Sequence, residues 1–259
     1  MKITIEEIAR KHGTDKLSHN YIPACSQYFD NLRKDSVNLL EIGVRYGNSI
    51  WTWHEYFEKG NIYGMDILNN AGYYKELHKT YRCPDGKNRA MWHHESTGEL
   101  VKFTHLEKKQ QAKLNEQTIQ QIRERLPKDR FDLIIGDQSK VEDLAKVSEA
   151  CEEGFDIIID DGSHAAAHQQ ITLNYLFKHL KPGGIYVIED LMMGTQRHNR
   201  GIAAGAVSTN SVLKSFKSTG KIGNRYITDS GYLEENIESI DWPLSGTGNN
   251  KICFIRKVS

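Results

Sequence analysis

Short apolar runs alternate along this chain with longer segments whose apolar residues recur at helical spacing. The runs typical of strands are 37–44, 61–67, 131–139, 155–161, 181–191 and 251–257, with a weaker one near 226–228. The segments typical of helices are 4–12, 21–33, 49–57, 140–152 and 165–180. Strands that alternate with helices imply right-handed crossovers and a mainly parallel α/β sheet covered on both faces. The run FDIIIDD at 155–161 is the most β-rich, so we predict that it is the central strand.

One long segment interrupts this alternation. Residues 70–130 are polar and contain a highly charged stretch, 107–126, that is typical of an amphipathic helix with few apolar positions. We interpret 70–130 as an insertion over the surface, and favour a solvated helix and linker over a substrate lid. Residues 1–35 are predicted to be a helical segment in which Gly13 ends the first helix. We expect one domain over 1–259.

Composition narrows the class of protein. A chain of 259 residues fits one large α/β domain, and its 34 basic and 34 acidic residues cancel. This balance predicts neither a nucleic-acid partner nor an anionic-membrane partner. The four cysteines form no CxxC pair, which argues against a zinc knuckle or disulfide framework and suits a reducing compartment. With no signal-like or membrane-spanning apolar run in the sequence, we expect a cytoplasmic protein.

The first two predicted strands end in residues suited to a ligand. Ligands of doubly wound sheets bind beyond the carboxyl ends of the strands. Glu41 ends the first strand, and Gly43 and Gly47 permit a sharp turn with close backbone approach. Asp66 ends the second strand, where an acid can accept both hydroxyls of a ribose. A glycine turn with only a structural role remains the alternative.

The glycine spacing distinguishes between cofactors. A dinucleotide site needs GxGxxG, whereas here the glycines are four apart and enclose Arg45 and Tyr46. Together with Glu41 the turn suits a cationic ligand, such as a sulfonium with an amino-acid tail. Asp137 and Gln138, after the third strand, form a further cluster that would contact an adenine. An Asx turn before the next helix is the equal alternative for these two residues.

The segment IIIDDGSH is the most informative motif. Side chains alternate along a strand, so Asp160 and Asp161 point in different directions, one toward the cofactor and one toward the substrate cleft. His164 lies within reach of the same cleft, and histidine is well matched to proton abstraction near neutral pH.

A second acidic pair, Glu189 and Asp190, follows the apolar strand IYVI. In a parallel sheet its strand end lies on the same edge as Asp161, so three carboxylates are expected to converge. Three hard oxygen donors without cysteine suit Mg²⁺, which would lower the pKa of a substrate hydroxyl whose proton His164 takes. The alternative is that the acids only cap the following helices.

As a set, these motifs resemble a known family. The segments are HGTDK (12–16), LLEIGVRYGNS (39–49), IYGMDI (62–67), GDQS (136–139), IIIDDGSHAAAHQ (157–169) and LKPGGIYVIEDL (180–191). They resemble the class I methyltransferases of antibiotic-sugar and surface-glycan pathways, especially the metal-dependent macrolide-sugar O-methyltransferases of the mycinamicin and macrocin type. The resemblance implies a Rossmann-like sheet of seven strands, the last antiparallel, and an N-terminal segment, His12–Lys16, that folds over cofactor or substrate.

The resemblance also implies ligands and residue roles. It implies S-adenosylmethionine as methyl donor and Mg²⁺ as metal, with His164 as the general base. The metal ligands would be Asp161, Glu189 and Asp190. The cofactor would lie near Glu41, Gly43, Gly47, Ser49, Asp66, Asp137 and Gln138, with Asp160 supporting that side or the loop. By analogy with relatives, the protein would be a homo-oligomer.

The sequence departs from the family where acceptor specificity is usually set. Residues 192–201 read MMGTQRHNRG in place of an aromatic-rich stretch, the 70–130 segment is long, and 192–250 matches no family segment. The leading hypothesis is therefore methyl transfer to a hydroxyl of a sugar, glycan or glycosylated metabolite. The alternatives are a catechol-like or other small acceptor and a non-catalytic cofactor-binding domain. An oxidoreductase is disfavoured by the glycine spacing.

Overall fold

The computed structural model describes residues 3–68, 79–82, 88–102, 105–192, 207–243 and 251–259. The chain divides into two compact units, one formed by Met1–Asp66 with Pro127–Ser259 and the other by Ile67–Leu126. Each unit is described by itself. Two parts of the predicted acceptor region 192–250, namely 193–206 and 244–250, lie outside the described residues.

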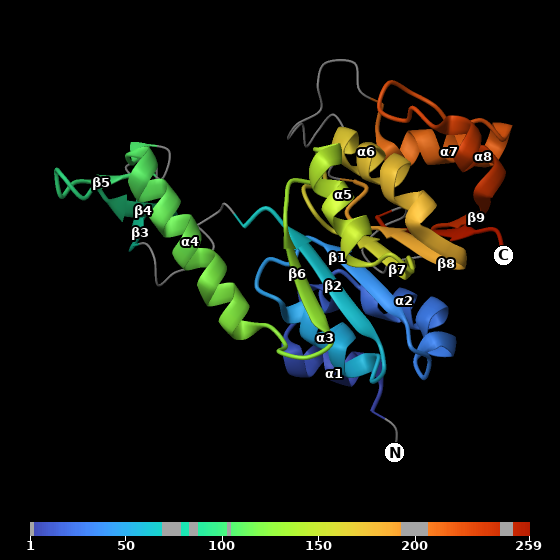
Figure 1. Ribbon diagram of the computed structural model, residues 1–259, viewed down its shortest axis with the longest axis horizontal. Helices are drawn as coiled ribbons and strands as arrows, with labels where there is room; N and C mark the ends of the chain where they lie inside the picture. The colour runs from blue at the N-terminus through green and yellow to red at the C-terminus, as the bar shows by residue number, and fades with distance from the viewer. Residues whose placement is uncertain (1–2, 69–78, 83–87, 103–104, 193–206, 244–250) are drawn as a thin grey trace. The chain divides into compact units, whose positions relative to one another are not determined.

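The larger unit is built on a seven-stranded sheet (Figure 1). In spatial order the strands are β6 (Phe131–Ile135), β2 (Asn61–Asp66), β1 (Asn38–Ile42), β7 (Phe155–Asp160), β8 (Leu180–Ile188), β10 (Cys253–Lys257) and β9 (Ile237–Asp241). The last strand in the chain, β10, is antiparallel to both of its neighbours, and the first five strands in this order are parallel. The predicted fold class is confirmed, and β7 is the central strand, as its apolar sequence predicts.

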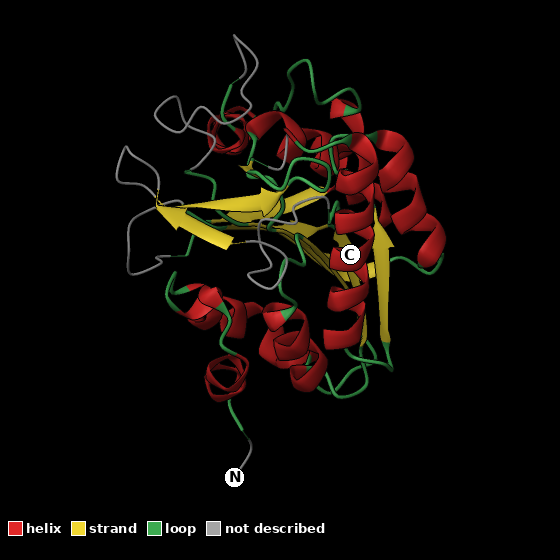
Figure 2. Ribbon diagram, turned by 90° about the vertical axis from the view of Figure 1, so that its left-hand side faces the viewer, coloured by secondary structure: helices red, strands yellow, loops and turns green. Residues whose placement is uncertain are grey.

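Helices cover both faces of this sheet (Figure 2). They are α1 (Ile5–His12), α2 (Tyr21–Phe29), α3 (Asn48–Tyr56), α5 (Val141–Ala150), α6 (Ala166–Leu176), α7 (Thr209–Thr219) and α8 (Ser230–Asn236). Helices α1 to α3 lie on one face and α5 to α8 on the other (Figure 1). One apolar core joins Leu144, Leu173, Leu213 and Leu233 of the second group to Ile158 of β7. Burial of these side chains is the main favourable contribution to the stability of the layers.

The first helix ends where a functional turn begins. Thr4 and Glu7 form a reciprocal capping box at the start of α1, and Gly13 ends the helix with a left-handed φ of 67°. The predicted C-cap is therefore confirmed. This turn leads into a short 3-10 helix, Asp15–Leu17, whose Lys16 is buried.

The C-terminal part of the larger unit differs from prediction. The weak strand expected near 226–228 is wrong, because this segment forms only an isolated bridge between Asn224 and Ile227. The Asn224 side chain accepts a hydrogen bond from the Tyr226 amide, which closes a turn there. The edge strand is β9 instead, and it is held by antiparallel pairing with β10. A short edge strand of mixed polarity depends on such a partner and has a weak pattern of its own.

The smaller unit contains a three-stranded antiparallel sheet and one long helix. The strands are β3 (Lys79–Arg82), β4 (Asn88–His93) and β5 (Leu100–Val101), and the helix is α4 (Lys108–Arg125). The amphipathic helix predicted at 107–126 is confirmed, whereas the three strands were not predicted. Trp92 and Leu106 form its small core with Val101 and Leu114. That this unit is a surface insertion remains a prediction. Among the described residues no helix has the length and apolarity required to cross a membrane.

Candidate active site

Backbone hydrogen bonds align the ends of the central strands. The Gly43 amide donates to the Met65 carbonyl at 2.8 Å, and the amides of Asp161 and Glu189 each donate at 3.0 Å to the carbonyls of Ile42 and Asp160. These bonds continue the parallel ladders one residue beyond β1, β7 and β8. The residues after the three strands therefore share one edge of the sheet, as predicted for a ligand site.

A buried lysine connects the acids at this edge. Lys16 is 1% exposed, and its Nζ lies 2.7 Å from Asp161 Oδ2, 2.8 Å from Glu189 Oε2 and 3.1 Å from Glu41 Oε1. Glu41 also accepts a 2.6 Å hydrogen bond from the Ser49 hydroxyl. The N-terminal segment thus contacts the predicted cofactor side and the predicted metal side through one ammonium group.

The protonation of this cluster follows from burial and charge. Burial opposes the charge of Lys16, but the three carboxylates prevail and raise its pKa well above the ordinary value. Burial also raises the pKa of Glu41 and of Glu189, although Lys16 acts in the opposite direction on both. Lys16 therefore stays charged, and three carboxylates share its single positive charge while burial opposes ionisation of Glu41 and Glu189.

A second group lies beside this cluster. Asp161, His164 and Asp190 each place one donor atom within 4.8 Å of the others. His164 Nε2 is 3.6 Å from Asp190 Oδ2, and the Tyr21 hydroxyl donates to Asp190 Oδ1 at 2.6 Å. His164 and Asp190 both have left-handed φ values, 58° and 52°, which non-glycine residues rarely adopt. Such strain is often retained at functional sites, where the surrounding structure holds it in place.

The donor set fits a divalent cation. The two carboxylates are ordinary ligands for Mg²⁺ or Mn²⁺, whereas an imidazole is more typical of softer divalent ions. Two buried atoms beside the group, His164 Nδ1 and Glu189 Oε1, have no hydrogen-bond partner within the described part of the chain. The sequence-based set was Asp161, Glu189 and Asp190. The structure groups Asp161 and Asp190 with His164 and turns one oxygen of Glu189 toward Lys16. The ligand set itself stays a prediction.

The glycines at this edge allow close approach of two strand ends. Gly43 has φ 95°, and a Cβ there would lie 2.1 Å from the Asp161 carbonyl oxygen. Gly162 is packed against Gln138, whose side-chain oxygen would lie 2.0 Å from an added Cβ. Gly47 is the left-handed N-cap of α3. Each glycine therefore has a structural reason to be present, and such a reason is compatible with a ligand above the turn.

Gly43→Ala is expected to lower the free energy of unfolding by about 2–5 kcal/mol, since left-handed strain adds to overpacking against backbone. Gly220→Ala is the matched control. Gly220 also has a positive φ, 69°, but a Cβ there meets nothing within 4 Å, so we expect only the strain of about 1 kcal/mol. Chemical denaturation measures both losses. Equal losses would show that the Asp161 contact is not the cause.

Two predicted cofactor residues face the turn after β1. Asp66, at the end of β2, accepts a 2.8 Å hydrogen bond from the Arg45 amide through Oδ2. Ser49, near the start of α3, is directed at Glu41 and is nearly buried. Asp66 and Glu41 therefore hold the backbone and the side chains around this turn in place.

The other three predicted cofactor residues are engaged within the protein. Asp137 accepts from both the amide and the hydroxyl of Ser139, which is the Asx turn weighed as an alternative. Gln138 donates to Asp160 at 3.0 Å and accepts from the Ser163 amide at 2.5 Å. Burial raises the pKa of Asp160 to about 6. Gln138 and Asp160 therefore hold the 160–164 loop in place through these hydrogen bonds. Their contact with a cofactor stays a prediction.

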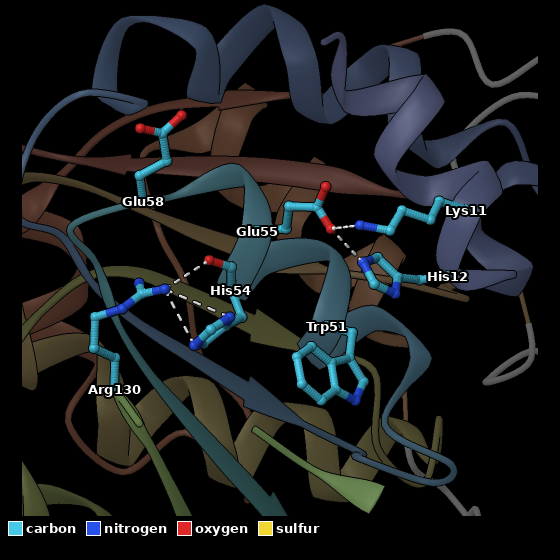
Figure 3. Close-up of a pocket in the computed structure, with 7 residues that line it drawn as sticks. All are labelled: Lys11, His12, Trp51, His54, Glu55, Glu58 and Arg130. Atoms are coloured by element: carbon cyan, nitrogen blue, oxygen red, sulfur yellow. Dashed lines mark hydrogen bonds and ion pairs between the residues drawn. The ribbon is translucent and has the colours of Figure 1, made fainter. Parts of the chain in front are cut away.

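A pocket of about 400 Å³ lies away from these acids, along the outer side of α1 and α3 (Figure 3). Its polar groups are largely paired with each other. Glu55 binds Lys11 and His12 at 2.7 Å each, and Arg130 donates to the carbonyls of Phe57 and Gly60. His12, the first residue of the HGTDK segment, lines this pocket rather than the carboxylate cluster. The pocket lacks the acids on which the proposed chemistry depends.

Sequence reasoning gave little weight to two residues of the site. Lys16 was expected near the site only because of the family resemblance, and Tyr21 was not expected there. Both come from the N-terminal segment, and Asp161 and Asp190 follow them by more than 140 residues in the chain. Nothing in the local pattern distinguishes Tyr21 from a core aromatic at the start of a helix. The lysine could have been suspected, because buried acids at strand ends need a counter-charge.

Comparisons with known proteins agree with this geometry. The 8-demethyl-8-alpha-L-rhamnosyl tetracenomycin-C 2'-O-methyltransferase of Streptomyces olivaceus is 29% identical over 192 residues, covering 71% of this chain and 36% of that protein. The mycinamicin VI 2''-O-methyltransferase of Micromonospora griseorubida is 28% identical over 199 residues, covering 73% and 36%. The chain thus spans about a third of the length of these curated relatives.

A solved structure shares the fold. It is the MycE methyltransferase of the mycinamycin biosynthetic pathway in complex with Mg, SAH and mycinamycin VI. The TM-score is 0.63 at 24% identity, over 99% of this chain and 55% of that one. The family described as methyltransferase domain matches residues 40–191, which hold the end of β1, the whole of β7 and β8, and the acids of the cluster at the sheet edge. Because this match covers more than half of the sequence, the chain belongs to the methyltransferase domain family.

Proposed function

We propose that this protein is a Mg²⁺-assisted, S-adenosylmethionine-dependent O-methyltransferase that acts on a hydroxyl of a sugar or glycosylated metabolite. The observation that carries the proposal is the surplus of negative charge at one sheet edge. Four carboxylates, Glu41, Asp161, Glu189 and Asp190, are connected through Lys16 or lie within the adjacent cluster. Buried or half-buried acids in such excess are costly unless cations neutralise them.

The charges suggest which cations the site accepts. Fully ionised, the four carboxylates and one ammonium would give a formal charge of minus three, from 4 − 1, and burial opposes that charge at Glu41 and Glu189. One divalent metal ion and one sulfonium would bring it to zero. Glu41 lies on the β1 side, where the family match and the glycine turn favour the cofactor. Asp161 and Asp190 lie on the other side with His164, where a metal ion and an acceptor would meet.

Different residues of the site would contribute to binding the cofactor, binding the metal ion and removing the proton. Methyl transfer forms a bond between the acceptor oxygen and the methyl carbon, and the carbon–sulfur bond breaks with its electron pair moving to sulfur. A divalent cation bound by Asp161, Glu189 and Asp190 would lower the pKa of the acceptor hydroxyl. His164 accepts the hydroxyl proton at Nε2, the ring nitrogen that faces Asp190. Glu41, Ser49 and Asp66 hold the cofactor in line, since placement contributes as much as basicity.

The acceptor class is proposed from the relatives. Those named above methylate sugar hydroxyls of a tetracenomycin and a mycinamicin, according to their names. Neighbouring sugar hydroxyls can chelate a metal ion, so a metal ion held by the acidic cluster would help to bind such an acceptor. Of the residues expected to select the acceptor, 192–250, the structure describes 192 and 207–243. The proposal therefore names the class of acceptor and not the particular sugar.

Calorimetric titration of the whole chain tests the proposal. We expect saturable binding of Mg²⁺ and of S-adenosylmethionine, because each neutralises part of the carboxylate cluster. With labelled methyl donor and a panel of glycosylated acceptors, incorporation should require Mg²⁺ and disappear with EDTA. Cofactor binding without any metal binding would remove the support for a metal-assisted reaction and leave a cofactor-binding domain.

A further inference from the structure

We propose that the N-terminal clamp, Thr14–Tyr21, positions the metal-binding carboxylates from behind. Lys16 orients the carboxylates of Asp161 and Glu189, and Tyr21 orients the carboxylate of Asp190. The inference rests on the proposed function, because it takes these three acids as the ligands of a divalent cation. It adds that residues of the clamp, which do not bind the metal ion themselves, set its affinity.

The three carboxylates are held in the same way. Lys16 Nζ contacts one oxygen each of Asp161 and Glu189, at 2.7 and 2.8 Å, and the Tyr21 hydroxyl contacts Asp190 Oδ1 at 2.6 Å. The second oxygen is left for another partner. Glu189 Oε1 is buried and has no hydrogen bond among the residues described, and Asp190 Oδ2 faces His164. Fixing one oxygen of a carboxylate orients the other, which is how groups behind a metal site tune it.

The clamp is itself firmly fixed. Lys16 and Tyr21 are each 1% exposed, so neither side chain is free to move into solvent. Burial, followed by Asp190, raises the pKa of the Tyr21 hydroxyl, which therefore remains a donor at neutral pH. Arg45, in the turn after β1, donates to Asp15 of the clamp at 2.8 Å. The clamp is thus joined to the turn proposed for the cofactor as well as to the acids.

The opposite role for Lys16 would be competition, with its ammonium occupying the cation site. Two observations argue against this role. Lys16 also reaches Glu41, so three carboxylates already share its charge. The donor cluster of Asp161, His164 and Asp190 includes two residues that have no ion pair with Lys16 in the described chain. Competition and positioning predict opposite changes in metal affinity when the lysine is neutralised.

Mn²⁺ titration followed by electron paramagnetic resonance tests the proposal in the whole protein. Tyr21→Phe removes only the hydroxyl, and we expect Mn²⁺ to bind about 10–100-fold more weakly, with SAH affinity and Tm near wild type. Tyr28→Phe is the matched control, because Tyr28 lies on the same helix and its ring stacks on Phe254, away from the acids. Wild-type Mn²⁺ affinity in Tyr21→Phe would overturn the proposal.

Lys16→Met and Lys16→Arg extend the test to the lysine. Lys16→Met should weaken Mn²⁺ binding, and Lys16→Arg should restore part of it. Lys11→Met is the control, since Lys11 is exposed and pairs with the half-buried Glu55, away from the cluster. Tighter Mn²⁺ binding by Lys16→Met would establish competition and overturn the proposal. If Lys16→Met does not fold, Tyr21→Phe decides alone. If the wild type does not bind Mn²⁺, the proposed metal dependence is refuted as well. If the wild type binds Mn²⁺ and the variants bind it with the same affinity, only the role of the clamp is refuted.

Discussion

His164→Ala is expected to reduce turnover by about 10²–10⁴-fold, the usual contribution of a positioned general base. The side chain lies beside the acids proposed for the metal, with Nε2 3.6 Å from Asp190 Oδ2. Affinity for S-adenosylmethionine should stay near that of the wild type, because Glu41, Ser49 and Asp66 are untouched. Steady-state kinetics with labelled methyl donor, combined with cofactor titration, measures both quantities.

The structure offers a control and a discriminating result for this variant. His179→Gln changes a histidine that directly precedes β8, at the opposite edge of the sheet, and should leave turnover unchanged. Mn²⁺ affinity separates two roles of His164. A base should leave metal binding largely intact, whereas a ligand from the donor cluster should not. Full turnover by His164→Ala at neutral pH would refute its assignment as the base.

Asp161→Asn is expected to abolish divalent-cation dependence and to reduce turnover by about 10²–10⁴-fold, corresponding to several kcal/mol of lost charge stabilisation. Asparagine keeps the shape of the side chain but removes the charge that Asp161 offers both to the donor cluster and to Lys16. Calorimetry with Mg²⁺ and assays over a range of Mg²⁺ concentrations measure the effect.

Asp156→Asn is the matched control for this change. Asp156 lies near the start of β7, the strand that Asp161 follows, and it also pairs with a lysine, Lys181, at 2.9 Å. The pair lies at the other edge of the sheet, so its loss should reduce stability modestly without altering Mg²⁺ dependence. If both variants lose activity equally, general destabilisation rather than metal binding is the cause.

The sequence by itself determined the architecture of the larger unit. Short apolar runs such as 155–161 and helical periodicity such as 4–12 are local patterns, and burial in a layered fold follows directly from them. The carboxyl ends of parallel strands must meet at one edge, so the acids after β7 and β8 could be placed together in advance. In contrast, the edge strand β9 and the strands of the smaller unit escaped prediction, because short strands of mixed polarity are stabilised by their partners rather than by a strong pattern of their own.

Only the tertiary structure decided how the acids divide their contacts. Asp160 and Asp161 are adjacent in the sequence, yet one is held under the loop by Gln138 and the other meets Lys16 at the sheet edge. The sequence could not bring Lys16 and Tyr21 to these carboxylates, because such contacts join segments separated by more than 140 residues and depend on how α1 and α2 pack. A strand pattern fixes which residues reach the edge, whereas side-chain partners there follow from packing and charge across the whole fold.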